Sequence, residues 1–177
     1  MKKILSALAF IFSTFFSYSQ QTSTDTMQWT ESRKLDWNDF TGKATGKNGV
    51  LGHATMIMNA KYHKGLKKTT SVEAVFDRKS SFAAANEKTP AMLKYYQTLF
   101  DLYEAECRTL RKQFKETRFG LDPDKVFKEK YDAALKALGE RVDDYMEETE
   151  TGNNGEEVNK WAKNLQLELK ELEAFKK

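Results

Sequence analysis

Cysteine and histidine are scarce in this sequence of 177 residues, which has one cysteine and two histidines. A single thiol, Cys107, cannot form a disulfide within the chain, so packing must stabilise the fold. Cys107 falls on the apolar face of an expected helix, and this position favours a buried small hydrophobic residue over a reactive thiol. His53 and His63 are too few for a catalytic zinc site, which takes three protein ligands and a water. We therefore interpret both histidines as surface or strand-edge residues.

An excess of charge of one sign is also absent, since 29 Lys and Arg residues stand against 26 Asp and Glu residues. No basic block stands out, so nothing indicates a nucleic-acid partner or an acidic membrane surface. The sequence also lacks a Gly-rich phosphate loop, a Gly-x-Ser-x-Gly turn and a Cys-x-x-Cys pair. The acidic run before TGNNG lacks the Asp-x-Asp-x-Asp-Gly spacing of a calcium loop, and we interpret it as a solvated helix end.

Long apolar runs are confined to the N-terminus. Lys2 and Lys3 precede an apolar stretch over residues 4–16, which is too short to span a bilayer as a helix, and small residues stand just before Gln20. This pattern is typical of a secretory signal peptide. We expect a soluble periplasmic or secreted protein with no membrane span in the mature chain. The expected organisation is a signal peptide over residues 1–19, a polar leader over 20–27 and a single domain over 28–177.

Two segments of alternating hydrophobicity predict an N-terminal β-hairpin. Met56 and Met58 begin an alternation that predicts a strand over residues 50–62. A second alternation, in which Phe76 belongs to the apolar face, predicts a strand over 68–77. The short connection around Gly65 joins the two strands.

Three helices are expected after the hairpin. Thr89-Pro90 and Asp122-Pro123 each place a capping residue before a proline at the first helical position, and the third helix is expected over residues 156–175. Aromatic residues on these helices recur at helical spacing and are interpreted as core. Strands followed by helices predict an α+β domain, with an antiparallel β-hairpin or small sheet packed on three long C-terminal helices.

Three segments resemble the motifs of a known family. The first, RKLDWNDFTGKA over residues 33–44, has a leucine followed by Trp-x-Asp-Phe-x-Gly. The second is the hairpin with VEAVFDRKSSF over 72–82, and the third is the helical half. In these segments the chain resembles a family of exported bacterial proteins, which is catalogued as domain of unknown function nine-two-two. The members of this family are predicted to be zinc-dependent proteases. The resemblance implies a zinc-protease-like scaffold over nearly all of the mature chain.

The resemblance also implies that the catalytic residues are replaced. The family's helix carries His-Glu-Gln-x-His-Phe-Asp, in which two histidines share a zinc and the glutamate is the general base. Tyr95 and Leu99 stand at the two histidine positions, Tyr96 at the glutamate and Thr151 at a further histidine. The positions that match the family motifs are Trp37, Asp39, Phe40, Gly42, Gln97, Phe100, Asp101, Tyr145, Glu148, Thr149, Gly152 and Trp161.

Leucine has no lone pair, and tyrosine binds a metal well only after losing a proton with a pKa of about 10. We therefore expect no metal, no cofactor and no catalysis, but a pseudoenzyme whose former metal pocket is filled by side chains. It would have a binding or scaffolding role in the cell envelope, with a peptide or a cell-wall component as its partner along the old groove. One alternative is a metal-dependent peptidase with a relocated site, in which His53, His63 and either Asp101 or Glu104 converge. Another is a structural exported domain without a specific ligand.

Overall fold

The computed structural model describes residues 25–43, 49–62, 68–118 and 120–177. The expected signal peptide and most of the expected leader lie outside these ranges, as does His63. No helix among the described residues is both long enough and apolar enough to cross a membrane.

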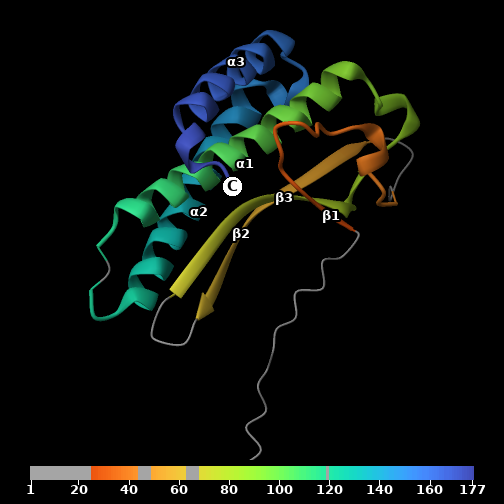
Figure 1. The fold of residues 1–177 in the computed structure, drawn as a ribbon. Coiled ribbons are helices and arrows are strands. Elements are labelled where there is room, and N and C mark those ends of the chain that lie inside the picture. Colours follow the sequence, from red (N-terminus) through yellow and green to blue (C-terminus); the bar gives the residue numbers. More distant parts are fainter. Residues whose placement is uncertain (1–24, 44–48, 63–67, 119) are drawn as a thin grey trace, which may run out of the picture.

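Three antiparallel strands form a single sheet. The strands are β1 (Thr26–Gln28), β2 (Val50–Tyr62) and β3 (Lys68–Ala83), in the order β1-β3-β2. β3 is therefore central, and it pairs with β2 over nearly its whole length (Figure 1). In the β2–β3 register Met56 lies opposite Ala74, and both side chains are buried. Along β3, the buried Val72 and Ala74 alternate with the less buried Ser71 and Glu73, as expected for a half-buried strand.

Two strand boundaries differ from the sequence prediction. β1 begins at Thr26, two residues before the expected start of the domain, because residues 26–28 pair with 75–77 of β3. β3 continues past residue 77 to Ala83, through a stretch whose state the sequence pattern did not determine. The register shifts between Leu51, which pairs with Phe82, and His53, which pairs with Asp77.

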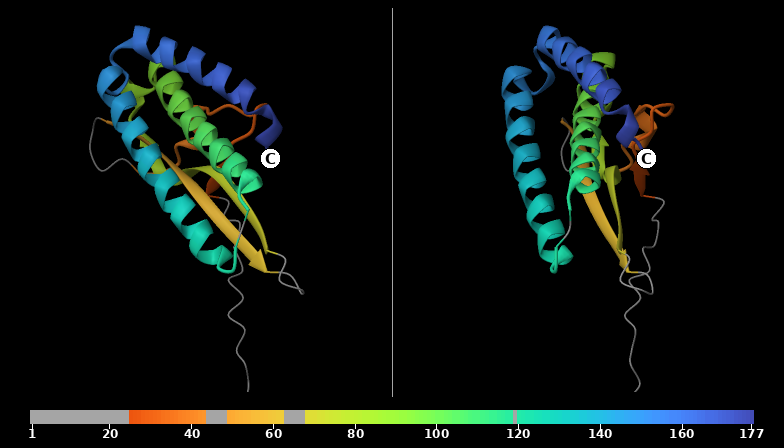
Figure 2. Two further views of the ribbon diagram at one scale, coloured as in Figure 1. Left: turned by 90° about the vertical axis from the view of Figure 1, so that its left-hand side faces the viewer. Right: turned by 60° about the vertical axis from the view of Figure 1, so that its left-hand side comes forward.

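Three helices follow the sheet: α1 (Pro90–Glu116), α2 (Pro123–Glu148) and α3 (Gly155–Glu171). α1 packs on the sheet, and α3 ends four residues before the expected residue 175. As predicted, Thr89 caps α1 and Asp122 caps α2, each accepting a hydrogen bond from a backbone N–H of the first turn. α1 contacts β3, α2 and α3 and is the centre of the domain (Figures 1 and 2). The predicted α+β class is confirmed, and the likeness to a zinc-protease scaffold stays a prediction.

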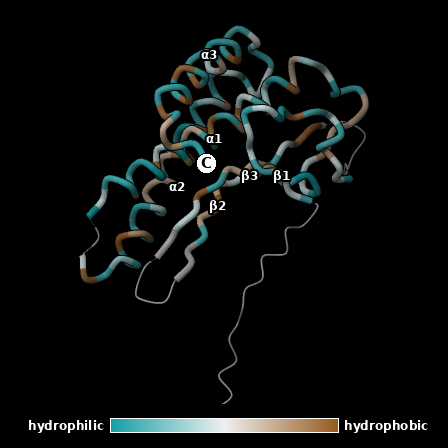
Figure 3. The backbone as a smooth tube through the Cα atoms, viewed as in Figure 1, coloured by the Kyte–Doolittle hydropathy of each residue, from teal (hydrophilic) through white to brown (hydrophobic). Residues whose placement is uncertain are grey.

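The core surrounds α1, with the sheet on one side and the buried faces of α2 and α3 on the others. Hydrophobic and hydrophilic residues alternate along all three helices (Figure 3), as amphipathic helices require. Cys107 is fully buried among these apolar side chains, so the predicted role as a small hydrophobic residue is confirmed. The sides of α1 that face away from the sheet contact α2 and α3, which leaves α1 with few exposed positions.

Candidate functional site

The predicted former metal site is occupied by packed tyrosines. Tyr95, Tyr96 and Leu99 are all buried on α1. The Tyr95 ring stacks on Tyr145 of α2, with ring centroids 5.1 Å apart and planes inclined by 15°. It also meets Tyr96 edge to face at 5.0 Å. These geometries are the favoured ones for aromatic pairs, so the rings stabilise the junction of α1 and α2.

Two hydroxyls of this tyrosine cluster, which comprises Tyr95, Tyr96 and Tyr145, are held by the backbone. The Tyr145 hydroxyl donates to the carbonyl oxygen of Tyr95 at 2.9 Å, and the Tyr96 hydroxyl donates to that of Val50 at 3.0 Å. Burial raises the pKa of Tyr95 to about 12 and also raises the pKa values of Tyr96 and Tyr145. The three phenols therefore stay protonated at neutral pH, in the form that binds metals poorly.

The fourth position of the predicted site faces solvent. Thr151 lies in the 3-10 helix η3 (Glu150–Gly152), and its exposed side chain donates to the carbonyl oxygen of Glu150. Glu150 and Thr151 have φ near +50°, and Gly152 has φ of +96°. A Cβ atom added at Gly152 would lie 3.1 Å from Cγ of Tyr95. The turn after α2 thus reaches Tyr95 through Gly152, whereas the Thr151 side chain points away from the buried cluster.

The matched positions near this turn have structural contacts. The Trp161 ring packs edge to face on Tyr145 at 5.4 Å, and its Nε1 donates to a Glu148 carboxylate oxygen at 2.7 Å. The Thr149 hydroxyl donates to the carbonyl oxygen of Tyr145 at 2.5 Å. These contacts join the end of α2 to α3 and to the tyrosine cluster.

The matched N-terminal motif also has a structural role. Asp39, at the end of the 3-10 helix η1 (Trp37–Asp39), is 1% exposed and accepts hydrogen bonds from the Arg33 guanidinium and the Asp36 backbone N–H. Phe40 packs edge to face on Tyr96 at 5.6 Å and tilts against Trp37 at 4.9 Å. The motif therefore docks the N-terminal segment on the core.

Three further matched positions also have structural contacts. Gln97 accepts a hydrogen bond from the Leu35 backbone N–H at 2.7 Å. Phe100 packs on Phe76 at 5.8 Å between ring centroids. A Cβ added at Gly42 would lie 2.5 Å from the carbonyl oxygen of Lys79, so only glycine allows this close approach of two backbones.

The relocated metal site does not form from the described residues. His53 is exposed on β2 opposite Asp77, whereas Asp101 and Glu104 are buried on α1. Across residues 25–43, 49–62, 68–118 and 120–177, no group of three or more His, Cys, Asp or Glu side chains is placed to hold a metal ion. His63, the other histidine of that alternative, lies outside these ranges.

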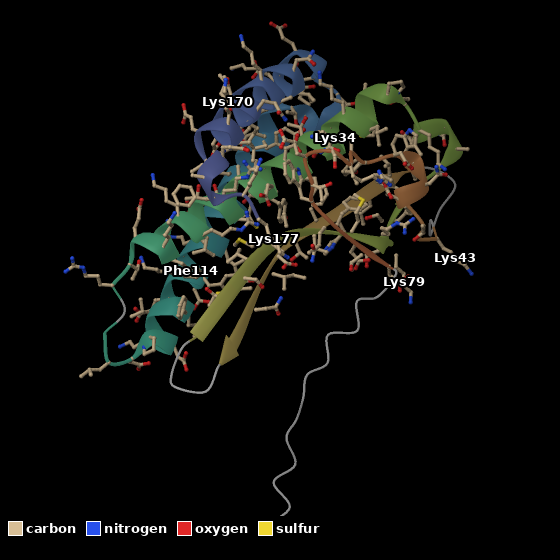
Figure 4. The ribbon with its side chains drawn as sticks, in the orientation of Figure 1. Lys34, Lys43, Lys79, Phe114, Lys170 and Lys177 are labelled. Carbon is tan, nitrogen blue, oxygen red and sulfur yellow. The ribbon has the colours of Figure 1, made fainter. Side chains whose placement is uncertain are left out.

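Two adjoining hollows lie on another part of the surface, where the segment after β1 meets α1, α3 and the C-terminal residues. Their volumes are about 290 and 540 Å³. Both are lined by Trp29, Glu31 and Arg108, and we call them together the Trp29 groove. Lys34 and Lys170 line the larger hollow and Lys177 lines the smaller one (Figure 4). Neither hollow is lined by the four positions of the predicted former metal site.

A buried aspartate positions Trp29 in this groove. The backbone N–H of Trp29 donates to the carbonyl oxygen of Ala74, and its indole Nε1 donates to Asp101 at 2.7 Å. Gln97 and Gln166 also donate to the Asp101 carboxylate, from α1 and α3. Burial raises the pKa of Asp101, while these hydrogen bonds oppose the rise. Asp101 thus joins α1, α3 and the segment that carries Trp29, at the Nε1 edge of the indole ring.

A buried ionic network forms the floor of the groove. Glu104, 3% exposed, accepts from Arg108 Nε at 3.0 Å and from Arg111 Nη1 at 2.9 Å. Arg108 is 2% exposed, and its guanidinium carbon lies 5.2 Å from the centroid of the Trp29 ring. Sequence reasoning missed this network. Its indication in the sequence was the spacing: Arg108 and Arg111 follow Glu104 by four and seven residues, which places all three charges on one helix face.

Comparison with known proteins adds no further identification: no protein family, no curated protein and no solved structure matches this chain. The resemblance to the exported protease-like family therefore stays a prediction.

Proposed function

We propose that this chain is an exported, non-catalytic binding protein that takes its ligand in the Trp29 groove. The observation that carries this proposal is the contrast between two regions. The tyrosine cluster is closely packed with its phenols protonated, whereas the groove offers an indole face and charged side chains around open space. Concave sites that combine an apolar wall with a few polar groups are typical ligand sites.

The absence of catalysis follows from the side chains at the four predicted positions. A zinc peptidase needs neutral imidazoles as ligands and a carboxylate as general base. Tyr95 and Tyr96 supply protonated phenols, and Leu99 supplies no donor atom. Export follows from the expected signal peptide over residues 1–19. A peptide or a cell-wall component is the expected kind of ligand, now assigned to the Trp29 groove instead of the former metal site.

An NMR screen of small fragments against the full mature chain tests this proposal. The indole N–H resonances of Trp29, Trp37 and Trp161 report separately on the groove, the N-terminal motif and the tyrosine cluster. We expect binding fragments to shift the Trp29 resonance and to leave that of Trp161 in place. The Trp29 resonance is assigned as the one that is missing from the spectrum of the Trp29→Phe variant. A screen of peptide and sugar fragments with no effect on Trp29, or with shifts confined to Trp161, would overturn the proposal.

The relocated peptidase is the second candidate to be tested with the same sample. Incubation of the zinc-supplemented protein with an unstructured protein substrate is expected to give no cleavage. Cleavage that is abolished by His53→Ala would establish the relocated site, because His53 has no part in the Trp29 groove.

A further inference from the structure

We propose that the larger hollow of the Trp29 groove binds a carboxylate carried on an apolar group, as at the C-terminal residue of a peptide. This inference rests on the proposed function and specifies the ligand class of the same site. It starts from the charges around the hollow. The cations Lys34, Arg108 and Lys170 line it together with the acids Glu31 and Glu173.

Arg108 has a donor that no described residue uses. Its Nε donates to Glu104 and its Nη1 donates to the carbonyl oxygen of Leu169 at 2.6 Å, with Glu173 at 3.5 Å. Its Nη2 has no hydrogen-bond partner among the described residues. Because the side chain is 98% buried while its guanidinium lines the hollow, this donor has a fixed position beside open space. Nη2 is not among the buried side-chain atoms that lack a partner, so it reaches solvent, and a ligand oxygen there would accept a charge-assisted hydrogen bond from a donor that is already held in position.

Two lysines add positive charge at the rim of the same hollow. The ammonium of Lys170 makes no hydrogen bond or ion pair with any described residue. Lys34 lies 3.8 Å from Asp101 and 5.4 Å from the centroid of the Trp29 ring, and its side chain is about half exposed. Of the two acids, Glu173 is paired with Lys176. Glu31 also pairs with Lys176, at 3.9 Å. Lys34 and Arg108 are paired with buried acids, so Lys170 is the cation of this hollow that is left to attract an anion.

The apolar part of the ligand is indicated by the walls. Trp29, Leu167 and Leu169 line the larger hollow, and Leu167 is 55% exposed. An aliphatic or aromatic group next to the carboxylate would cover Leu167 and the indole ring. A C-terminal hydrophobic residue of a peptide has both parts within one residue.

The matched probes N-acetylphenylalanine and N-acetylphenylalaninamide test the inference, because they differ only in the carboxylate. Titration of each into the full mature chain at low ionic strength is followed by the Trp29 indole N–H resonance and by calorimetry. We expect the acid to bind at least 10-fold more tightly than the amide, as a charge-assisted hydrogen bond allows. Equal binding of the two would overturn the inference and leave the proposed function standing. Tighter binding of phenyl phosphate than of the acid would overturn the assignment to a carboxylate.

Substitutions of Lys170 and Arg108 test the contribution of each cation to binding of the acid. Lys170→Gln is expected to weaken binding of the acid about threefold and to leave the affinity for the amide unchanged. The control is Lys163→Gln, at an exposed position of α3 outside the groove, which is expected to change neither affinity. Arg108→Gln is expected to weaken binding of the acid at least 10-fold. If that variant does not fold, the double variant Lys34→Gln/Lys170→Gln replaces it, with an expected loss of about 10-fold. Unchanged affinity for the acid in the folded variants, or no binding of either probe to the unmodified chain, would overturn the inference.

Discussion

Raising the pH above 10 is expected to destabilise this protein through its buried tyrosines. Burial raises the pKa of Tyr95 from 10.0 to about 12, so the folded chain holds this proton more tightly than the unfolded chain does. The stabilising contribution of the protonated phenol is complete below pH 10, and it is lost as the pH rises from 10 through 12. Tyr96 and Tyr145 have pKa values that are raised in the same direction and add to the loss.

The magnitude follows from the difference between the two pKa values. For Tyr95 alone, the free energy of unfolding falls by about 1.4 kcal/mol at pH 11 and by about 2.7 kcal/mol when the titration is complete. Such a loss is a large part of the stability of a domain of this size, which is of the order of 5–15 kcal/mol. Together with the losses at Tyr96 and Tyr145, it is expected to bring the chain to an alkaline unfolding transition above pH 11.

Absorbance at 295 nm, which reports tyrosinate, and far-UV circular dichroism are measured together against pH. The signals of the buried tyrosines and of the helices are expected to change in the same transition. Tyr95→Phe keeps the stacking on Tyr145, so it is expected to change stability little at pH 7 and to move the alkaline transition to higher pH. Titration of Tyr95 near pH 10 with unchanged helical signal would refute the reasoning, because a phenol that ionises in the folded state is not desolvated.

Three further changes test the packing around the site. Gly42→Ala is expected to lower the free energy of unfolding by about 1–3 kcal/mol in urea, because its Cβ would meet the carbonyl oxygen of Lys79 at 2.5 Å; an unchanged midpoint would contradict that close approach. Asp101→Asn is expected to destabilise by about 1–3 kcal/mol and to shift the Trp29 indole resonance, whereas an unmoved resonance would show that Asp101 does not position the ring. Burial raises the pKa of the Cys107 thiol, so iodoacetamide at pH 8 is expected to leave it unmodified in the folded protein and to alkylate it in urea; rapid alkylation of the folded protein would disprove its burial.

The helices could be predicted from sequence because their start signals are local. Thr89-Pro90 and Asp122-Pro123 each define the start of a helix to within one residue. Both helices begin at the proline in the structure. β1 could not be predicted, because Thr26–Gln28 is too short and polar for an alternation, and its strand state depends on pairing with residues 75–77. The extension of β3 to Ala83 likewise depends on a distant partner, Val50 of β2.

The tyrosines were predictable as core, but the groove was not. Helical spacing places Tyr96 and Tyr145 on apolar stripes, and both are buried. Trp29 gave no such indication, because its position depends on Asp101, which lies 72 residues away and is reached only in the folded chain. Arg108 was also missed, because composition suggests exposure for a charged residue and only the tertiary contacts with Glu104 and Leu169 explain its burial.

Metal analysis of the dialysed protein tests the central claim most directly. The unmodified chain is compared with the variant Tyr95→His/Tyr96→Glu/Leu99→His/Thr151→His, after both have been exposed to zinc and dialysed without a chelator. We expect the unmodified chain to retain no zinc, because phenols and a leucine stand where imidazoles are needed, and zinc retained by the variant alone would support the alignment. One tightly held zinc per unmodified chain would contradict the account.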